Sequence, residues 1–288
     1  MEGSIIYLNG KLLPAQERHL SALDRGFTLG DGVFDTLRAV HGRVFRMNDH
    51  LDRLGRSAAT LQLPLPMDSV QLAEAISAVL EANGLADALI RITVSRGVPA
   101  ERGLMPPSSP VPTLAIHTTP FRGYPEETYR RGYTATISAI RRNETSPLSY
   151  VKSCNYLDSV LARMEADRRG HNEALMLNSA GWLACGSSCN LFLISGERLI
   201  TPSLECGVLD GITRRTVIEL AAGMAIDVSE RQITPQELLA AEESFVTNTA
   251  LGIMPLVEVD GEAIGQGSPG PTTLKLRSAY TELVQAIS

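Results

Sequence analysis

The sequence predicts an α+β protein built from two domains, and three observations support this prediction. The chain has 288 residues, which exceeds the roughly 100 to 150 of a typical single domain. Strand and helix patterns mix in its first part, whereas its second half is rich in strands with inserted helices. The polar segment TTPFRGYPEETYRRGY separates the two patterns. We therefore expect a small N-terminal α+β domain over 1–120, a linker over 121–132 and a larger C-terminal domain over 133–288.

The N-terminal domain is expected to begin with two β-hairpins. The run IIYLNGKLL places Asn9-Gly10 between apolar segments, and this dipeptide accepts positive φ at both central positions of a tight turn. The runs VFDTLRAV and RVFRM alternate apolar and polar residues around His41-Gly42, which is the period of half-buried strands. Two helices follow, one from Asn48 with helical apolar spacing and one from an Asp68 cap to about Asn83. The run ALIRITVSRG then predicts a strand.

The C-terminal domain is expected to be a sheet with three inserted helices. Its strand segments are YTATISAI, EALMLN, GWLA, NLFLI, SFVTNTA and MPLVEVDG. The helices are expected over 155–167, from the glycine of DGITRRTVIEL onward, and over 273–285. The first of them has one apolar face, formed by Leu157, Val160, Leu161 and Met164.

Composition and charge exclude several functional classes. Hydrophobic residues make up 44% of the chain, charged residues 20%, and the formal net charge is -6. No basic cluster indicates a nucleic-acid partner. The start MEGSIIYLNG does not resemble a signal segment, and no run approaches the roughly 20 apolar residues of a membrane span. We expect a cytoplasmic protein that binds neither nucleic acid nor membrane.

The stretch GWLACGSSCNLF contains two of the four cysteines, which are Cys154, Cys185, Cys189 and Cys206. The C-x3-C spacing suits a zinc clip, but no second close pair of ligands accompanies it. A chain of this length without a signal segment is expected to hold reduced thiols. We therefore expect no bound metal.

Lys152, in SYVKSCNYL, lies between a strand and a helix, where a single lysine is usually an ordinary edge residue. Two phosphate-suited elements follow it, Gly211-Ile212-Thr213 at a helix start and Thr247-Asn248-Thr249 at a strand end. A helix N-terminus offers unpaired N–H groups, and threonine adds a hydroxyl donor. An amine, a phosphate cradle and a loop of small polar residues are what pyridoxal 5'-phosphate requires.

In these features the sequence resembles the class IV aminotransferases, which are fold type IV pyridoxal-phosphate enzymes. The family includes branched-chain and D-amino-acid aminotransferases and aminodeoxychorismate lyase. The resemblance runs in order through LDRGFTLGDGVFDTLRAVHG, HLDRLGRSA, VKSCNYLDSVLARMEA, NEALMLNSAGWLACGSSCNLF, GVLDGITRRTV and TNTALGIMPLVEVDG. The run from Asp31 to Arg38 and the TNTALGIMP segment are most similar to the D-amino-acid aminotransferases and the lyases, although the Arg-x-His pair typical of the D-amino-acid enzymes is missing.

The resemblance implies a role for each matching residue. Lys152 matches the Schiff-base lysine, which also moves the proton between the substrate Cα and the cofactor. The residues implied to bind the cofactor are Arg53, Tyr156, Cys185, Ser187, Ser188, Ile212, Thr213 and Thr249. Those expected to line the substrate pocket are Phe34, Thr36, Arg38 and Arg102. Arg102 lies on a loop whose spacing differs from the family pattern by about one residue. The resemblance also implies a homodimer in which a loop of one subunit completes the partner's pocket.

Cys185 departs from the family pattern, because a glutamate that bonds the pyridine nitrogen is typical at that position. A carboxylate keeps the ring protonated, whereas a neutral thiol does not hold that proton. We expect slower loss of the Cα proton as a result. Glu173 lies on a strand well ahead of the loop, so we do not expect it to replace the missing carboxylate.

Three functions are consistent with these residues. The first is an aminotransferase that exchanges an α-amino group between an amino acid, with D- and branched-chain donors as candidates, and a 2-oxo acid. The second is an aminodeoxychorismate lyase that releases pyruvate to give 4-aminobenzoate. The third is a pyridoxal-phosphate-binding protein with weak or altered chemistry, which the thiol of Cys185 suggests.

Overall fold

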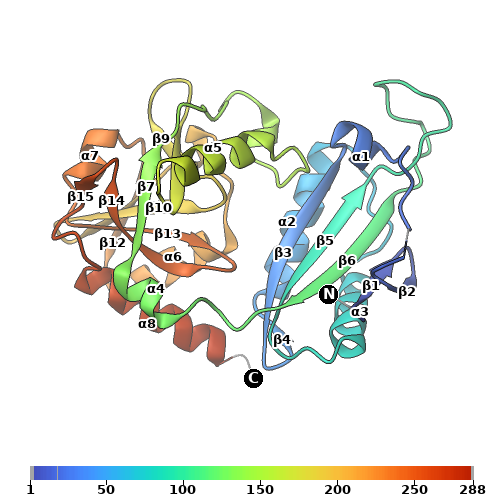
Figure 1. Ribbon diagram of the computed structural model, residues 1–288, viewed down its shortest axis with the longest axis horizontal. Coiled ribbons are helices and arrows are strands. Elements are labelled where there is room, and N and C mark those ends of the chain that lie inside the picture. The colour runs from blue at the N-terminus through green and yellow to red at the C-terminus, as the bar shows by residue number, and fades with distance from the viewer. Residues whose placement is uncertain (1–2, 18, 287–288) are drawn as a thin grey trace. The chain divides into compact units, whose positions relative to one another are not determined.

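The computed structural model describes residues 3–17 and 19–286 and divides into two compact units (Figure 1). The first unit contains the chain up to Arg122 together with Val151–Asn155, and the second contains Gly123–Tyr150 and Tyr156–Ala286. The segment that carries Lys152 thus belongs to the first unit, although its place in the chain lies inside the range expected for the second domain.

A six-stranded antiparallel sheet forms the first unit, in the order β2-β1-β6-β5-β3-β4. Its strands are β1 (Ile5–Leu8), β2 (Lys11–Pro14), β3 (Gly32–Val40), β4 (Arg43–Val44), β5 (Ala88–Ser95) and β6 (Thr113–Pro120). Both hairpin turns form as expected, because Asn9 and Gly10 have φ of 48° and 91° and His41 and Gly42 have φ of 52° and 79°.

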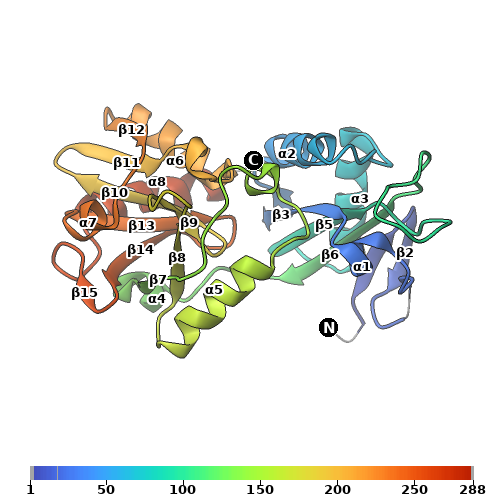
Figure 2. The ribbon, with the colours of Figure 1, turned by 90° about the horizontal axis from the view of Figure 1, so that it is seen from above.

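Two helices, α2 (Met47–Thr60) and α3 (Ser69–Ala82), pack side by side on this sheet (Figure 2). Leu51, Leu54 and Ala58 of α2 are buried in the core, as their helical spacing predicts. Asp68 forms a capping box with Gln71 at the start of α3. A five-residue helix, α1 (Arg25–Leu29), precedes β3.

A nine-stranded mixed sheet forms the second unit, in the order β12-β11-β10-β13-β14-β7-β8-β9, with β15 paired to β14. The β11–β12, β14–β7 and β7–β8 pairs are parallel. The strands are β7 (Tyr133–Ile137), β8 (Glu173–Leu177), β9 (Leu183–Gly186), β10 (Asn190–Ser195), β11 (Arg198–Pro202), β12 (Asp227–Arg231), β13 (Glu243–Asn248), β14 (Gly252–Val259) and β15 (Glu262–Ala263).

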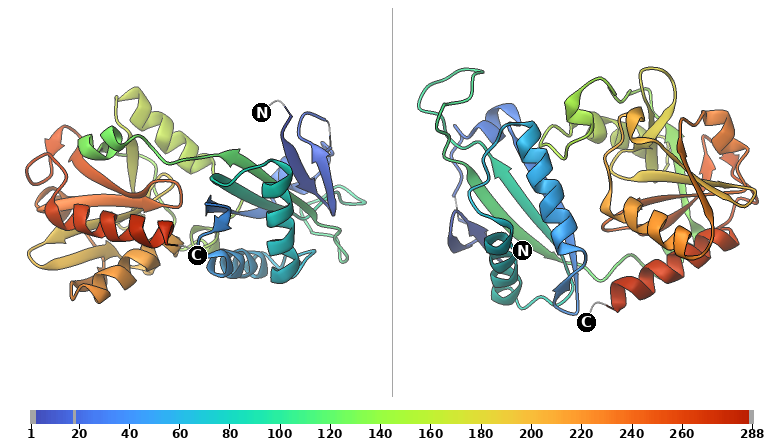
Figure 3. Two further views of the ribbon diagram at one scale, coloured as in Figure 1. Left: turned by 90° about the horizontal axis from the view of Figure 1, so that it is seen from below. Right: turned by 180° about the vertical axis from the view of Figure 1, so that it is seen from behind.

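Several α-helices accompany this sheet, and two of them, α6 and α8, pack together (Figure 3). Their bounds are α4 (Glu126–Arg131), α5 (Leu157–Arg168), α6 (Ile212–Gly223), α7 (Pro235–Leu239) and α8 (Pro271–Gln285). Two short 3-10 turns lie at Pro147–Ser149 and Leu204–Cys206. Helix α4 lies inside the segment expected to be a linker.

The apolar face expected of α5 is exposed rather than buried. Leu157 is 76% exposed, and Val160, Leu161 and Met164 are exposed by 47%, 50% and 51%. The buried side chains are instead the small ones, Ser159, Ala162 and Ala166, which let the helix lie close to β8. Periodicity shows which side chains share a helical face, but it does not show which face meets the sheet.

Within residues 3–17 and 19–286, no helix combines the length and apolar character that crossing a membrane requires.

A buried charge cluster joins α2 to β3. Asp35 has no exposed surface, and its two carboxylate oxygens accept hydrogen bonds from Nε and Nη2 of Arg53, each at 2.8 Å. Nδ1 of His50 lies 2.8 Å from Asp35 Oδ1. Burial alone would raise the pKa of Asp35, but the charge of Arg53 and the bonds with His50 and Arg53 hold that pKa well below its ordinary value. Asp35 is therefore ionised whenever the unit is folded at neutral pH.

Replacing Asp35→Asn is expected to lower the free energy of unfolding at pH 7 by about 3–5 kcal/mol, because it leaves the buried Arg53 charge uncompensated. The folded-state pKa of Asp35 is depressed, so its contribution is complete above the unfolded pKa of about 3.9 and is lost as the pH falls. Urea titrations should show a constant difference between the two proteins above about pH 4 and a shrinking difference as the pH is lowered further.

Asp49→Asn is the matched control, because Asp49 lies in the first turn of the same helix and is partly exposed. Its effect should stay within about 0.5 kcal/mol. An Asp35→Asn protein as stable as the wild type at pH 7 would show that the buried pair does not hold α2 on the sheet.

Candidate active site

Lys152 is held at the start of β3 by backbone hydrogen bonds. The amide of Phe34 donates to the Lys152 carbonyl at 2.9 Å, and the Lys152 amide donates to Ser57 Oγ of α2 at 3.2 Å. Cys154 N–H donates to the carbonyl of Gly32 at 2.9 Å. The Nζ atom of Lys152 lies 4.5 Å from the centroid of the Phe34 ring. The amine therefore has a defined position on a rigid strand edge.

Lys152 is also distinct among the lysines of the chain. The sequence contains three, Lys11, Lys152 and Lys275, and the other two are exposed to solvent whereas Lys152 is half-buried. A covalent bond to an aldehyde needs an amine protected from bulk water and held in place. Lys152 is the lysine that meets this requirement.

Helix α2 connects Lys152 with Arg53. Arg53 is buried and its guanidinium is oriented by the bidentate bond to Asp35. Ser57, which bonds the Lys152 amide, lies one turn further along the same face of α2. The phosphate-binding candidate and the amine thus belong to one fixed framework in the first unit.

The predicted substrate residues Phe34, Thr36 and Arg38 alternate along β3 on the face opposite the core. Arg91 of β5 lies opposite Thr36, and its Cζ atom is 3.6 Å from the centroid of the Phe34 ring. The sequence patterns did not single out Arg91. It does lie between Ile90 and Ile92, which face the core, and the alternation of a strand therefore places Arg91 on the opposite face of the sheet. The predicted Arg102 lies instead on the exposed irregular loop between β5 and β6.

In the second unit, α6 begins with an open cradle. Its N-cap is Gly211, no side chain caps the helix, and its first turn contains no acidic residue. Ile212 and Thr213, the first two helical residues, are buried. A Cβ on Gly211 would lie 2.1 Å from Asn190 Oδ1, so only glycine fits. The N–H groups of a helix start, beside a threonine hydroxyl, suit an anion such as phosphate.

Two asparagines join the loop over 187–189 to its neighbours. Asn190 Nδ2 donates to the carbonyl of Leu209, just before α6, at 3.0 Å. Asn248 Nδ2 donates to the carbonyl of Ser188 at 3.3 Å, and its Oδ1 accepts from the amides of Ala250 and Leu251. Thr249 lies in the turn that Asn248 builds. Five of the seven predicted cofactor residues of this unit therefore lie on three connected segments, and these five are Ser187, Ser188, Ile212, Thr213 and Thr249. The other two, Tyr156 and Cys185, lie at the start of α5 and on β9.

Cys185 is buried on β9 in an apolar cluster with Ala184, Cys206 and Val208, covered by Trp182. Burial, reinforced by the charge of Glu173, raises the pKa of its thiol, although Arg142 opposes the shift. The thiol is neutral at pH 7, which is the character of a structural rather than a reactive cysteine. All four cysteines are free.

Glu173 reaches the loop, although it lies well ahead of the loop in the sequence. That it does not replace the carboxylate missing at Cys185 remains a prediction. The amide and the hydroxyl of Ser187 both donate to Glu173 Oε1, the amide at 3.0 Å, and Cys189 Sγ lies 3.3 Å from Oε2. The carboxylate is buried. The cause is the antiparallel pairing of β8 with β9, which brings the first residue of β8 next to the end of β9. The contact could not be predicted from the sequence, because Glu173 and Ser187 are separated along the chain and meet only through strand pairing.

A cavity of about 410 Å³ opens beside this carboxylate. Tyr156, Ser187, Ser188 and Glu173 are among the residues that line it, together with Tyr124, Tyr133, Ser159, Val160, Arg163, Met164, Asn172, Asn248 and Leu251. Burial, followed by the neighbouring Tyr124 and Glu173, raises the pKa of Tyr133 to about 12. Its hydroxyl therefore remains a donor at any physiological pH, and the cavity has the size and mixed lining of a small-molecule site.

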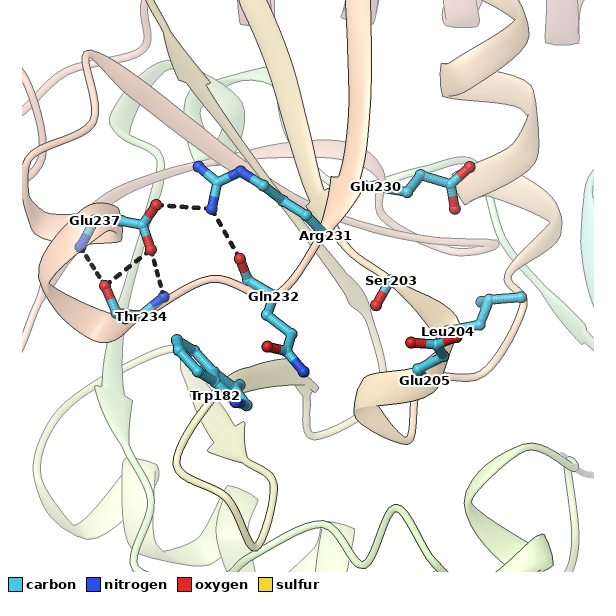
Figure 4. Close-up of a pocket in the computed structure, with 9 residues that line it drawn as sticks. All are labelled: Trp182, Ser203, Leu204, Glu205, Glu230, Arg231, Gln232, Thr234 and Glu237. Atoms are coloured by element: carbon cyan, nitrogen blue, oxygen red, sulfur yellow. Dashed lines mark hydrogen bonds and ion pairs between the residues drawn. The ribbon is translucent and has the colours of Figure 1, made fainter.

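A second hollow, of about 780 Å³, is lined by Trp182 and by residues around β12 and α7 (Figure 4). Three of its polar residues bond one another: Arg231 Nη1 pairs with Glu237 at 2.7 Å, and Thr234 and Glu237 form the capping box of α7. It contains none of the residues that the family resemblance selects.

The donor set fits pyridoxal phosphate. In the first unit, the oriented guanidinium of Arg53 suits its phosphate and the half-buried amine of Lys152 suits its aldehyde. In the second unit, taken by itself, the open start of α6 suits a phosphate. Gly211 lets Asn190 approach the start of α6 closely, because a Cβ at that position would collide with Asn190 Oδ1.

Comparisons with known proteins agree with this chemistry. The family model for amino-transferase class IV matches residues 32–259. The putative branched-chain-amino-acid aminotransferase of Methanocaldococcus jannaschii is 36% identical, with 96% of each chain covered. The D-alanine aminotransferase of Bacillus licheniformis is 29% identical, with 95% of each chain covered. The aminodeoxychorismate lyase of Bacillus subtilis is 29% identical, with 98% of this chain and 95% of the lyase covered.

Solved structures give the same result. The crystal structure of the branched-chain amino acid aminotransferase from Thermobaculum terrenum, which is in its pyridoxal-phosphate form, superposes with a TM-score of 0.89 at 27% identity. The match covers 99% of this chain and 95% of that one. The fold is therefore that of the fold type IV enzymes, as expected. The chain belongs to the class IV aminotransferase family and is a pyridoxal-phosphate-dependent enzyme.

Proposed function

We propose that the enzyme transfers the α-amino group of a branched-chain amino acid to a 2-oxo acid. The fixed position of Lys152 on the edge of β3, beside the ring of Phe34, is the observation that supports this most strongly. The name of the relative with 36% identity favours a branched-chain donor over D-alanine, whose aminotransferase is 29% identical. Branched-chain side chains are apolar, as is the ring of Phe34 next to the amine.

Each site residue has a proposed task. Bound pyridoxal phosphate supplies the electron-withdrawing ring that lets an amino acid lose its Cα proton. Lys152 holds the aldehyde carbon of the cofactor and then moves that proton as a general base. The phosphate is held by Arg53, Ile212, Thr213 and Thr249, and the ring by Tyr156, Ser187 and Ser188, with the thiol of Cys185 at the ring nitrogen. Phe34, Thr36, Arg38 and Arg102 contact the substrate.

The active form is proposed to be a homodimer in the cytoplasm. Phe27 on α1 is 80% exposed, and Leu157 on α5 is 76% exposed. Exposed apolar surface often marks a contact between proteins, and a second copy is the partner proposed here. Four free thiols suit a reducing compartment.

A lyase reaction is the second candidate, because the Bacillus subtilis relative is an aminodeoxychorismate lyase. Incubation with L-leucine or D-alanine and 2-oxoglutarate, and separately with aminodeoxychorismate, separates the reactions. Glutamate from L-leucine supports the proposal. If pyruvate and 4-aminobenzoate form from aminodeoxychorismate and no donor gives glutamate, the lyase reaction replaces the aminotransferase proposal. If no product forms in any incubation, the protein binds the cofactor but has weak chemistry.

Lys152→Ala is expected to abolish covalent attachment of the cofactor, because the remaining lysines are exposed. The proteins are incubated with pyridoxal phosphate, reduced with borohydride and digested, and mass spectrometry locates the modified peptide. Wild type, Lys11→Ala and Lys275→Ala should carry the group on Lys152. A group on another lysine in the wild type, at one equivalent, would show that the amine is assigned wrongly.

Cys185→Glu is expected to accelerate conversion of the cofactor by L-leucine by at least about tenfold, because a carboxylate holds the proton on the ring nitrogen. Cys185→Ser, which adds no charge, should give no acceleration. The absorbance change of the cofactor measures the rate. Trp182 is the single tryptophan and covers Cys185, so its fluorescence reports whether the cluster has rearranged. Unchanged fluorescence with a slower Cys185→Glu reaction would contradict the proposed place of Cys185.

A further inference from the structure

Arg25 is buried, only 4% exposed, and lies at the centre of a cluster that the reaction above does not use. Its Nη1 donates to the carbonyl of Gly103 at 2.8 Å and lies 3.5 Å from that of Met105, and its Nη2 donates to the carbonyl of Leu104 at 2.8 Å. Its Nε donates to Asp31 Oδ2 at 2.7 Å. One guanidinium thus holds three consecutive carbonyls of a loop that is far away in the sequence.

The same carboxylate oxygen connects Arg25 to helix α2. Arg96 Nε donates to Asp31 Oδ2 at 2.8 Å, while its Nη1 and Nη2 donate to the carbonyls of Gln62 and Leu61 at 2.9 Å and 2.7 Å. Carbonyls at the end of a helix lack partners within the helix, so Arg96 completes the end of α2. The loop is therefore fastened, through two arginines and one aspartate, to the helix that carries Arg53.

The base of the loop is closed as well. Gly97 has φ of 80°, and a Cβ there would lie 1.9 Å from the carbonyl oxygen of Val111, so glycine is required. The Arg25 amide donates to the Gly97 carbonyl at 2.9 Å. The segment over 96–112 contains no helix or strand, and loops of this length within compact domains usually carry function.

The hydrogen bonds from Arg25 determine which side chains of the loop face the solvent. Its carbonyls over 103–105 turn inward to Arg25, and the side chains of Leu104 and Met105 are 81% and 84% exposed. Arg102, which precedes them, is also exposed. A cation next to two apolar side chains matches the carboxylate and the apolar side chain of one amino acid.

We propose that Arg25 is a positioning residue for substrate recognition: it fixes the loop over 97–111 so that Arg102, Leu104 and Met105 recognise an amino acid with an apolar side chain. The inference rests on the proposed aminotransferase function. Arg25 touches neither substrate nor cofactor in this role, so it acts on substrate affinity. Its loss should therefore raise KM and leave kcat and cofactor binding nearly unchanged.

Arg25→Lys is the decisive variant, because an ammonium keeps the charge but lacks the planar fork that reaches Asp31 and three carbonyls together. Arg96→Lys is the matched control, since it breaks the bond to α2 and leaves the contacts of Arg25 with the loop. Amide hydrogen exchange over 98–110 should be at least about tenfold faster in Arg25→Lys than in Arg96→Lys. The KM for L-leucine should rise on the order of tenfold in Arg25→Lys alone.

The outcomes separate the two proposals. Unchanged exchange in Arg25→Lys, or an unchanged KM with a mobile loop, overturns the inference and leaves the aminotransferase proposal standing. A fall of kcat in parallel with the melting temperature also overturns it, because that pattern is general destabilisation. A wild-type enzyme that forms no glutamate from any donor overturns both. Faster exchange confined to the loop, together with a raised KM and an unchanged kcat, supports the inference.

Discussion

The ion pair between Asp35 and Arg53 is the constraint on which the first unit depends. A carboxylate without exposed surface can stay ionised only if a cation stays beside it, so α2 cannot slide along β3 without a large cost. Ser57 then meets the Lys152 amide further along the helix, and Arg96 meets the carbonyls at its end. The helix is therefore fixed at three places along its length, and two of these contacts, at Arg53 and Ser57, involve parts of the proposed site.

In the second unit, two asparagine amides and one buried carboxylate hold the loop over 187–189. The amides of Asn190 and Asn248 connect three segments that are separated in the sequence, and Glu173 fixes the loop between them through Ser187. Such side-chain amides position backbone without adding charge. The open start of α6 is an anion-attracting element of that region. The arrangement is suited to a phosphate and to a ring that lies on small polar residues.

Local chemistry made much of the fold predictable. Asn9-Gly10 and His41-Gly42 form the expected turns, and Asp68 caps the expected helix, because these preferences act over a few residues. Family membership, fold class and cofactor were also predicted from the ordered motifs and are confirmed. The individual roles of the site residues remain predictions.

Contacts between distant segments could not be predicted in the same way. The carboxylate of Glu173 reaches the loop through strand register, which a single sequence does not specify. The exposed face of α5 depends on which side meets β8. The burial of Asp35 could have been predicted, because it lies on the same face of the strand as the core residues Val33 and Leu37. A carboxylate on such an apolar face needs a buried cation beside it.

The central claim is that Lys152 and the residues proposed with it hold pyridoxal phosphate. A crystal structure of the wild-type enzyme grown with this cofactor tests it most directly. The account predicts continuous density from Lys152 Nζ, a phosphate contacted by Arg53 and by the amides of Ile212 and Thr213, and an intact bond between Arg53 and Asp35. A phosphate bound away from the start of α6, or an Arg53 that does not contact it, would contradict the account.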